Sequence, residues 1–148
     1  MRTRHIIIAV GVILMVGVGY YAISPLFINV RVDEALPQAG QETQGEPALA
    51  AEVKGTLGHP ASGTARIIYA DGKAYLRYEN FKTINGPDIL VYRSKDLDAK
   101  EFIDLGSVRA TEGNINYEIP ADIDPRDYPY ALTWCRAFSV LFNSAKLH

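Results

Sequence analysis

The chain has only one cysteine, Cys135, among its 148 residues. A single cysteine excludes an intramolecular disulfide, a Cys-x-x-Cys metal or redox pair, and the Cys-x-x-Cys-His attachment of a c-type haem. In an oxidising compartment a lone thiol is buried, bonded to a partner or reactive. The state of Cys135 therefore decides what chemistry this residue supports.

Other residues that bind metals or haem are scarce as well. The three histidines are His5, His59 and His148, and both methionines, Met1 and Met15, lie near the N-terminus. A blue-copper site uses about two histidines and one cysteine, often with a methionine, and haem iron commonly takes axial histidine or methionine. We therefore predict no metal site and no cofactor in the chain. Whether a partner supplies a haem or a metal stays open.

The sequence also lacks the signatures of hydrolytic and phosphoryl-transfer enzymes. It contains no Gly-x-Ser-x-Gly, no His-Glu-x-x-His and no P-loop. The formal net charge is -2, and the positive and negative residues are interspersed. A clustered basic surface for nucleic acid is therefore not indicated. These absences argue against a conventional enzyme and against a nucleic-acid-binding protein, and they leave a redox accessory protein open.

One long apolar run is present near the N-terminus, over residues 6–28. It is uncharged and exceeds the roughly 20 residues that a membrane-spanning helix needs. Arg2 and Arg4 precede it, and Asp33 and Glu34 follow it. The positive-inside rule then places residues 1–5 in the cytoplasm and the rest of the chain outside. We predict a single-pass cell-membrane protein that contacts the lipid bilayer through residues 6–28.

A cleaved signal peptide is the alternative interpretation of the same run, because it shares the basic start and the apolar core. The nearest Ala-x-Ala sequence, Ala48-Leu49-Ala50, lies far downstream of the run. Residues 33–50 contain no aromatic and no β-branched aliphatic residue, and such a composition cannot bury enough apolar area to fold alone. We therefore predict a flexible tether over residues 29–51.

The remainder of the chain has the period-two pattern of β-strands. Alternation is clearest at Ile115, Tyr117 and Ile119, and Asp71-Gly72 between two strand-like runs is a strong hairpin signal. The patterns predict about eight strands near residues 52–58, 63–70, 73–81, 88–94, 101–109, 114–119, 129–135 and 137–143, with a short helical piece around 96–100. The expected fold is all-β, an antiparallel β-sandwich or barrel after one N-terminal transmembrane helix.

An ordered series of short motifs resembles the electron-transfer DM-thirteen domain family. The series comprises Lys54-Gly55-Thr56, His59, Ser62-Gly63-Thr64-Ala65, residues 76–81 (LRYENF), Asn85-Gly86-Pro87-Asp88, Leu105-Gly106, residues 113–119 (GNINYEI), Trp134-Cys135-Arg136 and Phe138. This module occurs beside DOMON domains in Skeletor-type animal proteins and alone in many microbial proteins. The resemblance covers residues 52–148 and implies an extracytoplasmic β-domain with a redox role through a cysteine at the position of Cys135.

Two interpretations of Cys135 remain open at the sequence level. If Tyr130, Leu132 and Trp134 face the core, Cys135 points to the opposite face of its strand, beside Arg136. The positive charge of Arg136 would then favour the thiolate and make Cys135 a redox candidate. A β-bulge would reverse the faces, and Cys135 would be a small buried hydrophobic residue beside Trp134.

Further candidate binding residues are His59, Asn85, Asp88 and Trp134. His59 is either a proton-transferring or ligating group, or a turn histidine with a structural hydrogen bond. Asn85-Gly86-Pro87-Asp88 has the composition of a turn, although its oxygens would also suit calcium. Two functions follow from these observations. The first is a membrane-tethered redox accessory domain with a membrane or envelope redox protein as partner, and the second is a non-catalytic binding or adhesion module with a structural cysteine.

Overall fold

The computed structural model describes residues 2–23, 29–37 and 50–148. The first of these segments is a single helix, α1 (Arg2–Ile23), whose stretch from Arg4 to Tyr21 has a mean hydropathy of 1.7. Its apolar side chains are exposed around the whole helix. Within the described ranges this helix alone is long and apolar enough to cross a membrane, a property that signal sequences share. Residues 24–28 of the predicted anchor lie outside the described residues.

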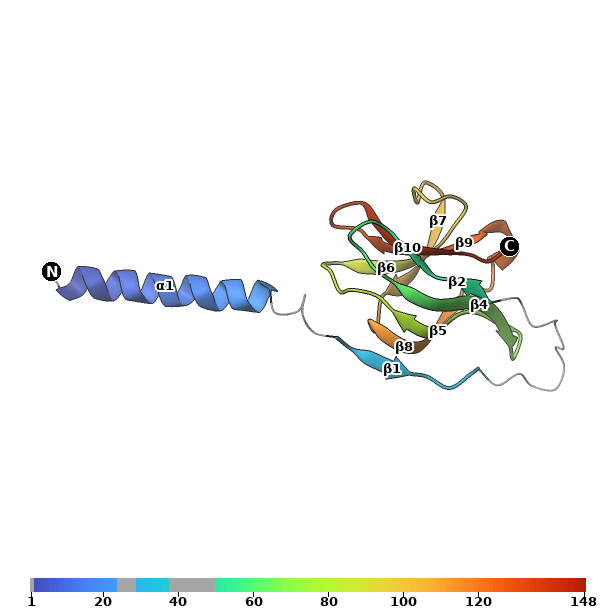
Figure 1. Cartoon of the computed structure of the whole chain (residues 1–148), viewed down its shortest axis with the longest axis horizontal. Coiled ribbons are helices and arrows are strands. Elements are labelled where there is room, and N and C mark those ends of the chain that lie inside the picture. Colours follow the sequence, from blue (N-terminus) through green and yellow to red (C-terminus); the bar gives the residue numbers. More distant parts are fainter. Residues whose placement is uncertain (1, 24–28, 38–49) are drawn as a thin grey trace.

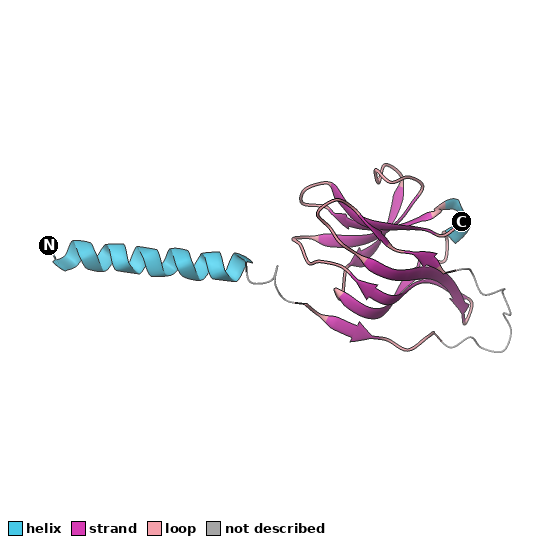
Figure 2. Cartoon of the chain, viewed as in Figure 1, coloured by secondary structure: helices cyan, strands magenta, loops and turns pink. Residues whose placement is uncertain are grey.

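The rest of the described chain is a sandwich of two five-stranded β-sheets (Figures 1 and 2). Sheet A has the strand order β1-β8-β5-β4-β2, and sheet B has the order β3-β10-β9-β6-β7. The strands are β1 (Arg31–Asp33), β2 (Ala51–Glu52), β3 (Lys54–Gly55), β4 (Ser62–Ala70), β5 (Lys73–Lys82), β6 (Ile89–Ser94), β7 (Phe102–Ser107), β8 (Glu112–Ile119), β9 (Tyr130–Cys135) and β10 (Val140–Lys146). The predicted all-β fold is confirmed, and the sheets form an open sandwich rather than a closed barrel.

The hairpin between β4 and β5 forms where the sequence predicts it. Asp71 and Gly72 both have positive φ, at 50° and 72°, and Ala70 pairs with Lys73. Two successive positive φ angles match the right-handed twist of the flanking strands, and aspartate and glycine tolerate them well. This turn sets the register of the longest strand pair in sheet A.

The main core lies between the two sheets. Sheet A contributes Leu76, Tyr78, Ile115, Tyr117 and Ile119, and sheet B contributes Val91, Ala131 and Ala145. These positions alternate along each strand, because successive side chains of a strand point to opposite faces. A second, smaller group of Leu90, Tyr92 and Leu132 covers the outer face of sheet B, where Trp134 packs against it. Sheet B is therefore apolar on both faces.

Part of the segment predicted as a tether forms a strand. Arg31–Asp33 pairs in parallel with the start of β8, with Val32 opposite Gly113. Val30 and Thr111 exchange backbone and side-chain hydrogen bonds, and Glu34 donates its amide to Asn114 and accepts the amide of Asn116 on its carboxylate. The sequence prediction of a tether beginning at residue 29 differs from the structure here because the partner strand lies about eighty residues away along the chain. Residues 38–49 of the predicted tether lie outside the described residues.

Two smaller sequence predictions are wrong. Residues 96–100 form a turn rather than a helix, because the Asp96 carboxylate accepts the amides of Asp98 and Lys100. Those same bonds lower the pKa of Asp96 below its ordinary value. The last predicted strand, 137–143, begins only at Val140, and Phe138 lies in the turn before it.

Candidate functional site

Four loops gather at one end of the sandwich, which we call the loop end. They are residues 56–61 between β3 and β4, 83–88 between β5 and β6, 108–111 between β7 and β8, and 136–139 between β9 and β10 (Figure 2). Strand β1 also begins here, since Arg31 pairs with Glu112 at the start of β8. Most of the candidate residues named from the sequence lie at this end.

Cys135 is fully buried at the end of β9, on the inner face of sheet B. Its side chain has 0% exposure and packs with Ile89 and Phe142. The thiol donates a hydrogen bond of 3.0 Å to the carbonyl oxygen of Pro87. Side chains alternate along β9 as predicted. The prediction of a reactive thiol required Leu132 and Trp134 to face the core and Cys135 to face outward, and the structure has the opposite arrangement. Ala131 faces the core between the sheets, whereas Leu132 and Trp134 lie on the outer face.

Arg136 binds Asp88 through two hydrogen bonds. Its Nε and Nη2 atoms lie 2.8 and 3.0 Å from the two carboxylate oxygens, and its backbone amide donates to the Asp88 carbonyl. This carboxylate raises the pKa of Arg136 above its ordinary value. The Arg136 charge is therefore engaged by Asp88. A thiolate-stabilising role for it stays a prediction that requires this ion pair to open.

His59 has a hydrogen-bond partner of its own in the 56–61 loop. Its Nδ1 lies 3.0 Å from Oγ1 of Thr56, and that hydroxyl also donates to the carbonyls of Leu141 and Phe142. The direction of the bond between Nδ1 and Oγ1 depends on the tautomer of the imidazole. The imidazole stacks on the Phe142 ring at 4.0 Å between centroids. These contacts of His59 are those of a structural turn histidine.

Phe142 links the histidine to the 83–88 loop. A Cβ on Gly86 would come within 2.9 Å of the Phe142 ring, so only glycine fits against it without a shift. Asn85 caps the same loop by accepting the Gly86 amide on its side-chain oxygen at 2.8 Å. Phe142 therefore packs between His59, Gly86 and the cluster that contains Cys135. In the sequence, Thr56 belongs only to a motif and Phe142 only to a strand pattern, and neither shows which loop packs against them.

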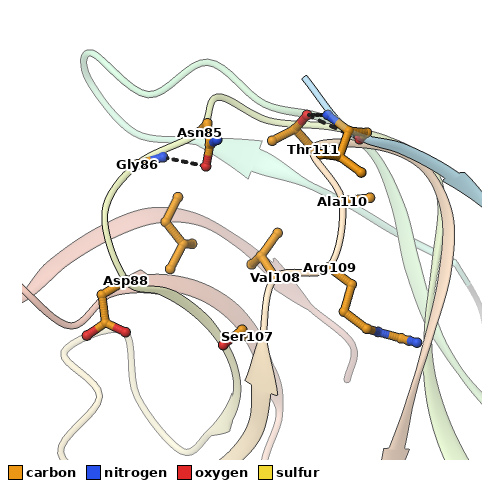
Figure 3. A pocket seen from close by; sticks show the side chains of 10 residues that line it. Asn85, Gly86, Asp88, Ser107, Val108, Arg109, Ala110 and Thr111 are labelled. Atoms are coloured by element: carbon orange, nitrogen blue, oxygen red, sulfur yellow. Dashed lines mark hydrogen bonds between the residues drawn. The ribbon is translucent and has the colours of Figure 1, made fainter. Parts of the chain in front are cut away.

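A pocket of about 240 Å³ opens on the other side of the 83–88 loop (Figure 3). It is lined by Val30, Asn85, Gly86, Asp88, Ile89, Ser107, Val108, Arg109, Ala110 and Thr111. Ile89 and Val108 also belong to the cluster around Cys135, so a thin layer of side chains separates the pocket from the thiol. Figure 3 shows the Asp88 carboxylate and the Arg109 side chain pointing to opposite sides, and Arg109 pairs with Glu34 at 2.8 Å. The lining of the pocket mixes polar and apolar side chains.

The structure thus brings together five of the six candidate residues: Cys135, Arg136, His59, Asn85 and Asp88. Trp134 lies on the outer face of sheet B, away from the thiol. Across residues 2–23, 29–37 and 50–148, no group of three or more histidine, cysteine, aspartate or glutamate side chains is placed to hold a metal ion.

Comparison with known proteins gives one match. The family model described as electron transfer DM13 matches residues 54–147. No curated protein and no solved structure matches the chain significantly. The matched range contains the whole loop end except β1.

Proposed function

The chain belongs to the electron transfer DM13 family, and from this premise we propose that it is a membrane-anchored, extracytoplasmic accessory module in electron transfer. The family match supports the role in electron transfer, and the apolar helix α1 supports the anchor. The basic residues Arg2 and Arg4 at the start of α1 support an outward-facing β-domain. A membrane or envelope redox protein is the expected partner.

The observation that carries a role for Cys135 is its position behind the 83–88 loop. The thiol is enclosed, yet the segment that covers it contains no strand. Thr83 anchors its start through Thr111 and Asn143, and its end is joined to β9 by the Cys135–Pro87 bond and by the two contacts of Asp88 with Arg136. Asp88 itself has a positive φ of 53°. Local opening of such a loop costs less free energy than global unfolding. We propose that Cys135 reacts only when this loop opens.

The same burial favours the alternative function, a binding module with a structural cysteine. A fully buried cysteine among Ile89 and Phe142 behaves as a small hydrophobic side chain. In that case the loop end binds a partner through the pocket, and the thiol takes no part. The two functions predict different reactivity of Cys135 in the folded protein.

Thiol labelling of the full chain in detergent micelles distinguishes them, with Cys135→Ala as the unlabelled blank. If loop opening exposes the thiol, Asp88→Asn raises the labelling rate of the folded protein by about three- to tenfold, because a bidentate ion pair that closes the loop is lost. Asp124→Asn is the matched control, since it breaks the Asp124–Arg126 pair outside the loop end and leaves the rate unchanged.

The redox step is tested with oxidised glutathione. The Cys135 thiolate attacks the disulfide of oxidised glutathione, forms a mixed disulfide and releases one glutathione thiolate. Mass spectrometry detects the mixed disulfide as a glutathione adduct of the protein. If the native chain and Asp88→Asn form the adduct at equal rates, both equal to the rate of global unfolding, the interpretation of Cys135 as a structural cysteine is the one that remains. That outcome removes the proposed role of Cys135 and does not affect membership of the family.

A further inference from the structure

We propose that the loop end lies against the lipid headgroup layer of the membrane that holds α1, with Leu57 and Phe138 inserted into the boundary between headgroups and acyl chains. This inference rests on the membrane anchor of the proposed function. It adds an orientation of the β-domain relative to the bilayer and names the surface that touches the lipid.

Exposed apolar side chains at the tips of different loops are the first observation. Leu57 is fully exposed (101%) and Phe138 is 70% exposed, which makes them the two most exposed large hydrophobic side chains of the β-domain. Ile84 and Val30 add smaller exposed areas at the same end. Neither Leu57 nor Phe138 belongs to any of the hydrophobic core clusters. Their exposure therefore has no explanation in folding.

The covalent chain is the second observation, and it selects the membrane as the occupant. Helix α1 ends at Ile23, and Val30 is already bonded to Thr111 in the loop end. Even a fully extended chain between these two residues spans at most about 25 Å. The nine residues of β4 add roughly 30 Å between the loop end and the opposite end of the sandwich. The loop end is therefore the end that an inserted α1 holds next to the bilayer.

Tyr20 and Tyr21 mark the level of the interface on α1. Both are exposed near the last turn of the helix, and tyrosine is enriched at the boundary between the hydrocarbon and the headgroups. If they lie at the outer boundary, the loop end begins only a short stretch of chain beyond it. The two tips then reach the headgroup layer without any rearrangement of β1.

A groove beside Ile84 supports lipid contact. It has a volume of about 310 Å³ and lies between the 56–61 and 83–88 loops, where Pro60, Ala61 and Ile84 form apolar walls. Lys82 stands at the same groove, and its amine lies 3.3 Å from Glu112. Because this positive charge is already paired, we expect apolar insertion rather than attraction to anionic lipid to dominate. The anchor also raises the local concentration of the loop end at the bilayer, so a few apolar side chains suffice.

Tryptophan quenching by lipids brominated on the acyl chains tests the proposal on the full chain in phosphatidylcholine vesicles. In a Trp134→Phe background, single tryptophans are placed as Leu57→Trp, Phe138→Trp, Leu97→Trp and Val12→Trp. Leu97 is the matched control, because it is a partly exposed leucine in the 95–101 turn, at the other end of β6 from the loop end. Val12 reports on the helix itself.

We expect Leu57→Trp and Phe138→Trp to be quenched at least about twofold more than Leu97→Trp, since quenching requires proximity to acyl chains. Quenching of Val12→Trp alone overturns the loop-end proposal and leaves the anchor intact. Absence of quenching at Val12→Trp removes the anchor and this proposal together. If the loop end contacts a protein partner instead of lipid, only Val12→Trp is quenched, and the loop-end proposal is overturned.

Hydrogen exchange provides a test that does not depend on the Trp134→Phe background. In vesicles of the same composition, the amides of residues 56–59 and 136–139 should exchange several-fold more slowly in the native chain than in a Leu57→Ser, Phe138→Ser double variant, because inserted loops are shielded from water. Equal exchange in the two chains contradicts insertion. Both substitutions are at exposed tips, so folding is preserved.

Discussion

Replacing Gly113 by alanine is expected to detach β1 from sheet A and to lower the free energy of unfolding by about 2–4 kcal/mol. Gly113 has a φ of +114°, a conformation that disfavours any residue with a Cβ. A Cβ at this position would lie 2.0 Å from the carbonyl oxygen of Val32, which is too close for any packed structure. The obstacle is backbone, so β1 has to move away.

Gly106→Ala is the matched control for this variant. Gly106 has a similar φ of +99°, but nothing lies within 4 Å of the position of its Cβ. It therefore measures the conformational cost alone, about 1–2 kcal/mol. Chemical denaturation of both variants gives the difference, and hydrogen exchange locates it. The amides of Val30 and Glu34 should lose protection in Gly113→Ala only, and retained protection there would contradict the close approach of β1 to β8.

Loss of β1 also changes the connection to the helix. The next strand after β1 is β2 at Ala51, so the chain between α1 and the first fixed point of the β-domain extends to residue 50. A chain of that length no longer holds the loop end near the bilayer. Gly113→Ala should therefore reduce the quenching of Leu57→Trp while leaving Val12→Trp unchanged.

Replacing Arg93 by methionine is expected to raise the free energy of unfolding by about 1–3 kcal/mol. Arg93 has 0% exposure, and only its Nη2 donates a hydrogen bond, to the Pro125 carbonyl at 2.8 Å. Its Nε and Nη1 have no partner within the described protein. Burial of this charge lowers the pKa of Arg93 from its ordinary value to about 10. Methionine fills a similar volume and has no charge to desolvate.

The pH dependence gives the same prediction a second test. Because the pKa of Arg93 is lower in the folded state, the unfolded chain binds more protons from about pH 10 up to the ordinary pKa of arginine. The cost of the buried charge is fully present below pH 10 and is relieved as the pH rises through that window. The advantage of Arg93→Met should therefore be constant near neutral pH and shrink above pH 10.

Thermal or urea unfolding of Arg93→Met and Arg93→Ala near neutral pH checks the effect. Arg93→Ala removes the charge but leaves a cavity, so it should be less stable than Arg93→Met by about 2 kcal/mol or more. Arg93→Met less stable than the native chain would show that the guanidinium is satisfied inside the sandwich, for example by buried water. That result would overturn the view of Arg93 as an uncompensated charge.

Much of the candidate site follows from local sequence. Asn85-Gly86-Pro87-Asp88 predicts a turn on composition alone, and it forms the loop that covers the thiol. The motif series that carries the family resemblance spans nearly the same residues as the family model. The role of each side chain does not follow in this way. Arg136 adjoins Cys135 in sequence, yet its charge is bound to Asp88, a partner that only the meeting of β6 and β9 supplies.

The apolar pattern of the last strand shows a similar limit. Phe138, Val140 and Phe142 alternate as the residues of one strand face do, and the sequence therefore predicts a strand over 137–143. The structure places Phe138 in an exposed turn, where Ser139 takes a positive φ of 53°, and only Val140 and Phe142 pack against the core. Periodicity records which residues are apolar, but it does not show where a hairpin turns.

Local residue patterns are sufficient to predict the apolar helix, the all-β class, the positions of most strands and the family, because each depends on residues that are close along the chain. Three further features arise only from the tertiary structure. It places Cys135 on the inner face of sheet B, docks β1 on β8 and buries Arg93 without a charged partner among the described residues. Each of these depends on contacts between segments that are distant in sequence, and those contacts are fixed only when the two sheets pack together.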